Sequence, residues 1–323
     1  MGVEFRNEGV RSNVLGKPMK EPQDVPFEKE GQYLKSDNRN NISYFLEHNV
    51  LLRRFTLSVG VLANYNSALN EGIHFYPGID ASYRIGDNFR LYGSWNRALR
   101  MPTFTDLYYE GKTNKGNPDL KPEESEAFEV GLKYNTYFLR AHIAGFYRKG
   151  KNMIDWVKEK PEDIWESRNL TKVDNLGFET NLNLLPRELG NERFFIRKIE
   201  LGYAFIHQDK DSEGYISNYA LDYLKHKFTA QLSHSIWKGF SATWYVRWQD
   251  RAGSYTKYEN LKPAYEEPYS PYCLVDMKVN WEYQRLNLYA ELNNLLNSTY
   301  YDLGNIPQPG IWFKAGFRYS FKY

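Results

Sequence analysis

The histidines are the side chains of this chain best suited to hydrolytic or acid–base chemistry. They are His48, His74, His142, His207, His226 and His234. A hydrolytic triad brings a nucleophilic Ser, a His and an acid or amide close together, and it is identified by geometry rather than by motif. No Gly-x-Ser-x-Gly sequence occurs, and the strand register described below turns His48, His207 and His234 outward near strand ends. The pattern therefore predicts a protein without enzymatic activity.

A second group that could do chemistry is acidic. Residues 209–214 read Asp-Lys-Asp-Ser-Glu-Gly and open like an EF-hand calcium loop, but the position that should be a bidentate Glu is Ala220. We interpret the stretch as a solvated acidic turn, with a looser calcium site as the alternative. The single cysteine, Cys273, excludes a disulfide or a Cys-based metal site within the chain. The sequence thus predicts neither a cofactor nor a resident metal.

Aromatic side chains gather in stretches that we expect to be long loops. They are Phe104, Tyr108, Tyr109, Tyr255, Tyr258, Tyr265, Tyr269, Tyr300 and Tyr301. Such rings can stack on a planar or glycosidic ligand, or they can form an interfacial girdle and pack the loops. The girdle accounts best for the set as a whole, and the candidate ligand contacts are Tyr108, Tyr109, Tyr255 and Tyr258. Because Tyr108 and Tyr109 are adjacent, only one of them can face inward from an extended chain.

The elements that position these residues are strands, because apolar and polar residues alternate along most of the chain. Residues 311–323 place apolar and aromatic side chains on one face and mostly polar ones on the other. This stretch ends in a predicted C-terminal assembly strand with Phe317, Tyr319, Phe321 and Tyr323. The same pattern predicts about fourteen strands. Their ranges are 2–10, 39–51, 54–65, 73–85, 88–98, 124–134, 137–157, 164–185, 195–208, 217–236, 240–250, 270–281, 285–294 and 310–323.

The two faces of these strands differ in charge. The expected outer faces carry no Lys, Arg, Asp or Glu, whereas the partner faces carry residues such as Asp80, Arg84, Glu129, Lys133 and Arg140. A Lys or Arg that faces lipid near the bilayer midplane costs roughly 2–4 kcal/mol. Many strands also reach the ~9–11 residues that cross a bilayer when tilted. The sequence predicts an all-β fold, a transmembrane antiparallel up-and-down β-barrel. A soluble β-sandwich or propeller, with strands of about 5–6 residues, is the alternative.

The bulk properties exclude two other classes of protein. Mean hydropathy is −0.69, and no window approaches ~18 uncharged apolar residues, which excludes a transmembrane helix. The chain has 42 basic and 40 acidic residues and a net charge of +2, so there is no electrostatic basis for binding nucleic acid. It begins in strand-like sequence without the parts of a signal peptide. We therefore expect the C-terminal part of a longer, exported protein.

The connections between the expected strands alternate in length. Tight ones lie near 52–53, 86–88, 135–136, 237–239 and 282–284, and long ones lie near 11–38, 99–123, 251–269 and 295–309. Short turns at one end and long loops at the other are typical of outer-membrane barrels, whose short turns are periplasmic. We therefore expect the tight turns and the C-terminus in the periplasm. The connection at 186–194 is longer than this rule predicts.

Two stretches resemble the TonB-dependent outer-membrane receptors. The first is a strand ending in Arg, then Pro-Thr with Leu-Tyr, an Asn-Pro-Asp-Leu-Lys-Pro-Glu loop and a strand of Glu-x-Gly type. Its residues, which we call the signature loop, are Pro102, Thr103, Leu107, Tyr108, Asn117, Pro118, Leu120, Lys121, Pro122 and Glu123. The second reads Asn-Asn-Leu-Leu-Asn at 293–297, then Pro-Gly at 309–310 and an aromatic-terminated strand. The chain departs from the family at Ile311, where Arg is usual, and at Tyr323, where Phe is usual.

The signature loop has two interpretations. Its prolines fix φ and end ladders, and Gly116 with Asn117 suits a tight turn, which favours a structural role. Direct contact with a ligand is the alternative. In the structural interpretation, Lys121 and Glu123 pair with neighbours in the loop.

The resemblance implies a fold and a function for the whole chain. Residues 1–323 would form the C-terminal part of the receptor's barrel domain, with about fourteen of a probable 22 strands and the plug domain absent. The family takes up scarce nutrients, of which ferric siderophores and cobalamin are the expected classes and a glycan is less favoured. Energy would come from the TonB complex through a plug that is not in this chain. Outer-membrane lipid and the barrel assembly machinery are further implied partners, in a Gram-negative outer membrane crossed several times. The alternatives are a passive porin-like or structural barrel, and a non-functional receptor remnant.

Overall fold

Long strands make up most of the molecule. The computed structural model describes residues 1–323 apart from 70–71, 161, 191–192, 212–213, 218–222, 261, 305 and 322–323. Within these residues, fourteen long strands belong to one sheet. They are β1 (Gly2–Ser12), β3 (Gln32–Leu51), β4 (Phe55–Asn66), β5 (Ile73–Ile85), β6 (Phe89–Arg100), β8 (Glu123–Asn135), β9 (Leu139–Lys158), β10 (Trp165–Leu184), β11 (Ile196–Asp211), β13 (Leu224–Trp237), β14 (Phe240–Arg251), β17 (Tyr272–Tyr283), β18 (Leu286–Asn293) and β21 (Trp312–Tyr319).

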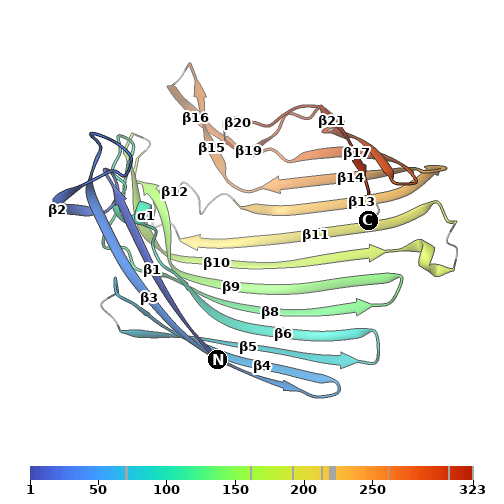
Figure 1. Cartoon of the computed structure of the whole chain (residues 1–323), viewed down its shortest axis with the longest axis horizontal. Coiled ribbons are helices and arrows are strands. Elements are labelled where there is room, and N and C mark those ends of the chain that lie inside the picture. Colours follow the sequence, from blue (N-terminus) through green and yellow to red (C-terminus); the bar gives the residue numbers. More distant parts are fainter. Residues whose placement is uncertain are drawn as a thin grey trace.

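The sheet is a meander in which each long strand pairs with the next one along the chain (Figure 1). All thirteen of these pairings, from β1–β3 to β18–β21, are antiparallel. β1 and β21 lie at the two edges, and no pairing joins them in the described part of the chain. The predicted all-β, up-and-down antiparallel architecture is confirmed.

Tight turns close one end of the sheet, which lies at the right in Figure 1 and is called the short-turn end below. They join β3 to β4, β5 to β6, β8 to β9, β13 to β14 and β17 to β18. The connection between β10 and β11, expected to be longer, contains the 3₁₀ helix η1 (Pro186–Leu189). This helix ends at Gly190 with a φ of 104°, a conformation that glycine adopts without strain. The residues by which this connection exceeds a tight turn thus include one turn of 3₁₀ helix.

The opposite, long-loop end carries the short elements. They are β2 (Lys17–Asp24), α1 (Phe104–Tyr108), β7 (Asn114–Lys115), β12 (Ile216–Ser217), β15 (Ser254–Glu259), β16 (Lys262–Pro268), β19 (Tyr301–Leu303) and β20 (Ile306–Pro307). Residues 11–38, expected to be a long loop, are instead largely β2 and the first part of β3. Their side chains are mostly polar, so the ladder continues there without the apolar alternation that predicts a strand. None of the helices in the described residues is of the length and apolar character that crossing a membrane requires.

The register sorts the side chains of the sheet onto two faces. One row across ten strands, from β4 to β17, is apolar or aromatic apart from one Thr. It consists of Phe55, Tyr83, Leu91, Leu132, Ile143, Thr180, Tyr203, Phe228, Trp248 and Cys273. The row one residue away, on the other face, is mostly polar. It contains Arg84, Arg90, Lys133, His142, Asn181, Gly202, Thr229 and Arg247. The predicted alternation of apolar and polar side chains is confirmed, and these surfaces are called the apolar face and the polar face below.

The C-terminal strand is shorter than predicted. β21 ends at Tyr319, which pairs with Leu286, the first residue of β18. One further backbone hydrogen bond, from the Ser320 amide to the Arg285 carbonyl at 3.0 Å, follows the end of the strand, and Phe321 lies beyond it. Phe317 pairs with Leu288 on the apolar face, whereas Tyr323 lies outside the described residues.

Candidate ligand-binding rim and polar basin

The first half of the signature loop is held by a capped helical turn at the long-loop end. Thr103 is the N-cap of α1: its Oγ1 accepts from the backbone N of Asp106 at 3.1 Å, and Asp106 Oδ2 accepts from the backbone N of Thr103 at 2.9 Å. This reciprocal pair is a capping box and satisfies two amide groups at the start of the helix. Leu107 is buried beneath the turn. The Pro102 carbonyl accepts from Nη1 of Arg39, on β3, at 2.6 Å.

The second half of the loop folds back onto this turn. A Cβ at Gly116 would lie 2.8 Å from the backbone N of Tyr108, so this close approach requires glycine. The Asn117 amide donates to the Asp106 carbonyl at 2.9 Å, and Leu120 is buried. The backbone of Lys121 exchanges two hydrogen bonds of 2.9 Å with the side-chain amide of Asn169 on β10. Pro118 and Pro122 lie between these anchored positions.

Glu123 ends the loop and connects three strands. Its carboxylate accepts from Nε and Nη2 of Arg100 on β6, at 2.6 and 2.5 Å, and from the backbone N of Ile154 on β9, at 2.7 Å. Only 7% of Glu123 is exposed. Glu123 therefore pairs with strand residues rather than with the loop neighbours that the sequence led us to expect. Lys121 is anchored through its backbone, and its ammonium forms no ion pair within the described residues, so it does not pair with a loop neighbour as expected.

The two candidate tyrosines on this loop have different surroundings. The Tyr108 hydroxyl donates to Asp37 Oδ2 at 2.5 Å, and burial together with this carboxylate raises the pKa of Tyr108 above its ordinary value. Tyr109 packs edge-on against Trp156, with ring centroids 6.4 Å apart, and remains 38% exposed. The hydroxyl of Tyr108 is thus hydrogen-bonded within the protein, whereas part of the Tyr109 ring remains exposed.

Tyr255 and Tyr258 lie on β15, which forms a hairpin with β16. Tyr255 packs between Tyr269 and Tyr301, with ring centroids 5.1 and 5.8 Å away. The pKa of Tyr255 is raised by burial and by Glu267, which accepts from its hydroxyl. Tyr258 is 56% exposed. Four strands lie between β8, which follows the signature loop, and β14, which precedes this hairpin: they are β9, β10, β11 and β13. The two tyrosine pairs therefore lie on separate parts of the long-loop end, which is called the rim below.

The histidines do not form a common site in the described residues. His48, His207 and His234 lie opposite apolar residues on the apolar face, as the register predicts. His142 lies on the polar face and shares the hydroxyl of Tyr92, 2.7 Å away, with Glu129 at 2.8 Å. Among the described residues, no group of three or more His, Cys, Asp or Glu could hold a metal. Ser212, Glu213 and Ala220 of the acidic turn lie outside the described residues.

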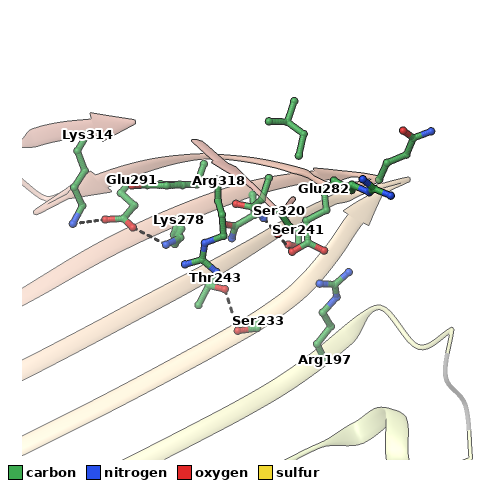
Figure 2. A pocket seen from close by; sticks show the side chains of 16 residues that line it. Arg197, Ser233, Ser241, Thr243, Lys278, Glu282, Glu291, Lys314, Arg318 and Ser320 are labelled. Carbon is green, nitrogen blue, oxygen red and sulfur yellow. Dashed lines mark hydrogen bonds and ion pairs between the residues drawn. The ribbon is translucent and has the colours of Figure 1, made fainter. Parts of the chain in front are cut away.

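A cavity on the polar face at the short-turn end was not predicted. Its volume is 760 Å³, and β11, β13, β14, β17, β18 and β21 supply its walls (Figure 2). Five cationic side chains line it: Arg197, Lys278, Arg285, Lys314 and Arg318. Charge alternation predicted that most of them would face the polar side, but only the pairing of these six strands brings them together. We call this cavity the polar basin.

This chain is similar to known transporters and receptors. The family model described as "TonB dependent receptor-like, beta-barrel" matches residues 1–295. The vitamin B12 transporter BtuB of Vibrio vulnificus is 27% identical over 52% of this chain and 36% of its own length. The ferrienterobactin receptor of Escherichia coli K12 is 23% identical over 83% of this chain and 38% of its own length.

Solved structures share the fold. A mutant of the ferric enterobactin receptor PfeA from Pseudomonas aeruginosa superposes with a TM-score of 0.74 and 19% identity, covering 99% of this chain and 50% of the receptor chain. The siderophore receptor PirA from Acinetobacter baumannii has a TM-score of 0.71 and 17% identity, covering 99% of this chain and 51% of its own. The chain therefore spans about half of these solved receptors and just over a third of the two curated relatives.

Proposed function

Because the chain belongs to the TonB-dependent receptor family, through that family's β-barrel, we propose that it is part of an outer-membrane receptor for active uptake of a scarce nutrient. The ligand class is a ferric siderophore or cobalamin, and TonB supplies energy through a plug domain that is not among residues 1–323. The observation that carries the proposal is the family match over residues 1–295. Residues 1–323 then form the C-terminal part of a barrel domain of about 22 strands.

The two faces of the sheet support this placement in a membrane. The apolar row from Phe55 to Cys273 faces lipid, where each Lys or Arg at the midplane would cost roughly 2–4 kcal/mol. The polar face lines the interior. By the usual arrangement of such barrels, the short-turn end and the C-terminus lie in the periplasm and the long-loop end lies outside. The barrel assembly machinery inserts the chain, with β21 as its C-terminal strand.

Ligand capture takes place at the long-loop end. There the exposed rings of Tyr109 and Tyr258 offer aromatic surface on separate parts of the rim, and the capped turn and Glu123 hold the signature loop in place next to Tyr109. Aromatic rings stack on planar ligand groups at little cost in conformational entropy. In this proposal the signature loop positions the rim, and Tyr109 and Tyr258 contact the ligand. Tyr108 and Tyr255 serve mainly to order the loops, because their hydroxyls bind Asp37 and Glu267.

An uptake assay with the complete gene tests the proposal. Cells that carry or lack the gene are given labelled cobalamin and a panel of labelled ferric siderophores, with and without TonB. We expect loss of uptake of one ligand in the deletion strain and in cells lacking TonB. Unchanged uptake of every ligand in the deletion strain would exclude the proposal for those ligands. TonB-independent diffusion, together with ion conductance of the reconstituted protein in a planar bilayer, would instead identify a passive barrel.

A further inference from the structure

The apolar face is hollowed near the short-turn end of β4, β5, β6 and β8. The cavity there has a volume of 270 Å³. Four larger side chains form its walls, namely Phe55, Tyr83, Leu91 and Val130. Ala81 and Gly93 pair with each other between these walls and fill little of the space, because their side chains are a methyl group and a hydrogen atom. The cavity is therefore an apolar depression in the surface that the sheet turns away from its polar face.

The cavity reaches down to the backbone of the sheet. Ser82 and Tyr92 also line it, although their side chains lie on the polar face, where the Tyr92 hydroxyl donates to Glu129 at 2.8 Å. A Cβ added at Gly93 would lie 3.4 Å from the Glu129 carbonyl oxygen and 3.7 Å from Val130 Cγ2, which are ordinary van der Waals distances. The sheet thus has room for a side chain at this position, and that room is open to an apolar group from outside.

A turn with two adjacent arginines lies beside the cavity. The Leu52 amide donates to the Phe55 carbonyl at 2.8 Å, so Arg53 and Arg54 are the two residues at the tip of the β3–β4 hairpin. Both are exposed, and no carboxylate lies within ion-pair distance of either among the described residues. The Arg84 amide donates to the Arg54 carbonyl at 2.7 Å, which holds the turn against β5. None of the other four tight turns has two adjacent cations, so this positive charge is particular to the short-turn side of the cavity.

The order of these features along the strands matches an amphipathic, negatively charged ligand. Ala81 pairs with Leu57, which is three residues from Arg54, a separation of about 10 Å along a strand. A phospholipid has the same order of groups, with a phosphate at one end and apolar chains leading away from it. The planar fork of a guanidinium matches a phosphate. A peptide suits the cavity less well, because this lining offers few polar groups to its backbone amides.

We propose that this cavity and the β3–β4 turn together bind one anionic phospholipid. One acyl chain packs between Tyr83, Leu91 and Val130, and the phosphate pairs with the guanidinium groups of Arg53 and Arg54. The inference rests on the membrane placement proposed above and puts the site in the leaflet at the short-turn end. The strands β3 to β8 that form the site each have neighbours on both sides, so strands that join the edges β1 and β21 leave it open.

Native mass spectrometry of the complete gene product in detergent micelles tests this site. Phosphatidylglycerol and phosphatidylcholine with the same acyl chains are added together, and the bound copies of each lipid are counted. We expect one phosphatidylglycerol to be retained in preference to phosphatidylcholine. The double change Arg53→Gln and Arg54→Gln should lower the affinity for phosphatidylglycerol by about tenfold or more, because each arginine near an anionic headgroup contributes a factor of about five. The matched control for charge is Lys238→Gln with Arg285→Gln, which removes exposed cations from two other tight turns and should keep the affinity within about twofold.

A second variant tests the cavity independently of the turn. Gly93→Leu fills the space that the acyl chain would occupy, so we expect the affinity for phosphatidylglycerol to fall by about threefold or more through lost packing contacts. Its matched control is Gly145→Leu, on the same row of the apolar face but outside the cavity, where an added Cβ meets only the Gly177 carbonyl oxygen, 3.9 Å away. This control should bind the lipid within about twofold of the unchanged protein. If Gly93→Leu does not fold, Ala81→Leu fills the same cavity from β5.

Several results would overturn the site. They are equal retention of the two lipids by the folded protein, equal losses in each variant and its control, and displacement of the lipid by inorganic phosphate as effectively as by phosphatidylglycerol. A dimer that holds no lipid would show that a second copy of the chain covers the cavity, and would overturn it too. None of these results bears on the proposed uptake, which is measured in cells. A protein that does not insert into lipid vesicles would instead contradict the membrane placement itself.

Discussion

At the scale of single residues, Glu123 does more than end a turn. It accepts two hydrogen bonds from Arg100 and one from the backbone of Ile154, while almost fully buried. The carboxylate thus ties the signature loop to the strands on both sides of β8. In the proposed receptor, we expect Glu123 to hold the signature loop in place rather than to contact a ligand.

Replacing Glu123 tests that role. Glu123→Ala leaves the Ile154 amide and the Arg100 guanidinium without their acceptor, so we expect the free energy of unfolding to fall by about 1–3 kcal/mol. Urea unfolding in lipid vesicles, followed by Trp fluorescence, measures the change. The neighbour Glu124 is the control, because it forms only an exposed pair with Arg97 at 3.6 Å. Glu124→Ala should cost less than about 1 kcal/mol, and equal costs for both changes would contradict the assigned role.

Tyr108 gives a prediction about pH. Its pKa is raised in the folded protein by burial and by Asp37, so folding favours the protonated phenol. This contribution to stability is complete below the ordinary tyrosine pKa of about 10 and is lost as pH rises through the raised value. In an ultraviolet titration, we expect Tyr108→Phe to change absorbance little near pH ~10 to 11, where ordinary tyrosines ionise. If Tyr108→Phe instead removed the absorbance change of one whole tyrosine in that pH range, Tyr108 would be shown to ionise like an ordinary tyrosine.

At the scale of elements, the long strands have an apolar face and a polar face across the middle of the sheet. On β8, Val130 lies on the apolar face, between Gly93 and Gly145 of the neighbouring strands, and is 63% exposed there. Lys133 lies on the polar face, where its ammonium is 4.6 Å from the centroid of the Tyr92 ring. The strand therefore presents one residue on the apolar face and one on the polar face, three positions apart.

These two residues provide a test of the membrane assignment. Val130→Arg should block assembly, since an arginine facing lipid costs roughly 2–4 kcal/mol near the midplane. Lys133→Ala removes a charge from the interior face, and its assembly should remain close to that of the unchanged protein. Folding into lipid vesicles, followed by protection from added protease, measures both. Equal tolerance of the two changes would contradict the assignment of faces.

At the scale of the whole molecule, the sheet has two edges in its described part. β1 and β21 each pair on one side only. β8 is paired on both sides over its length, and β9 and β10 have long strands on both sides over residues 140–151 and 172–184. Edge amides without a ladder partner open more readily than central ones. In the proposed complete receptor, further strands would join the sheet at these two edges.

Hydrogen exchange of the chain in micelles tests this view of the edges. We expect amides of β1 and β21 to exchange first and those of β8 to β10 last. In the complete protein, additional strands would pair with both edges and slow their exchange to the rate of central strands. Edges that are already as protected as β9 in this chain alone would show that β1 and β21 pair with each other.

The amino-acid sequence by itself determined the strands, their alternation and the family. A period of two is a local property, so residues such as Val130 and Lys133 could be assigned to opposite faces from their spacing alone. The Pro, Gly and Asn residues of the signature loop likewise specify turns locally. The ends of β3 and β21 were less predictable, because a polar strand has no apolar signal and a strand ends where its neighbour stops pairing.

Only the tertiary structure decided which distant residues meet. Glu123 reaches Arg100 and Ile154 because the registers of β6, β8 and β9 bring them together. Arg197 and Arg318 are 121 positions apart along the chain, yet both line one cavity. Spacing sets the face on which a side chain lies, but strand order and register set its neighbours across the sheet. A site formed across six strands therefore has no signature in any one segment of the sequence.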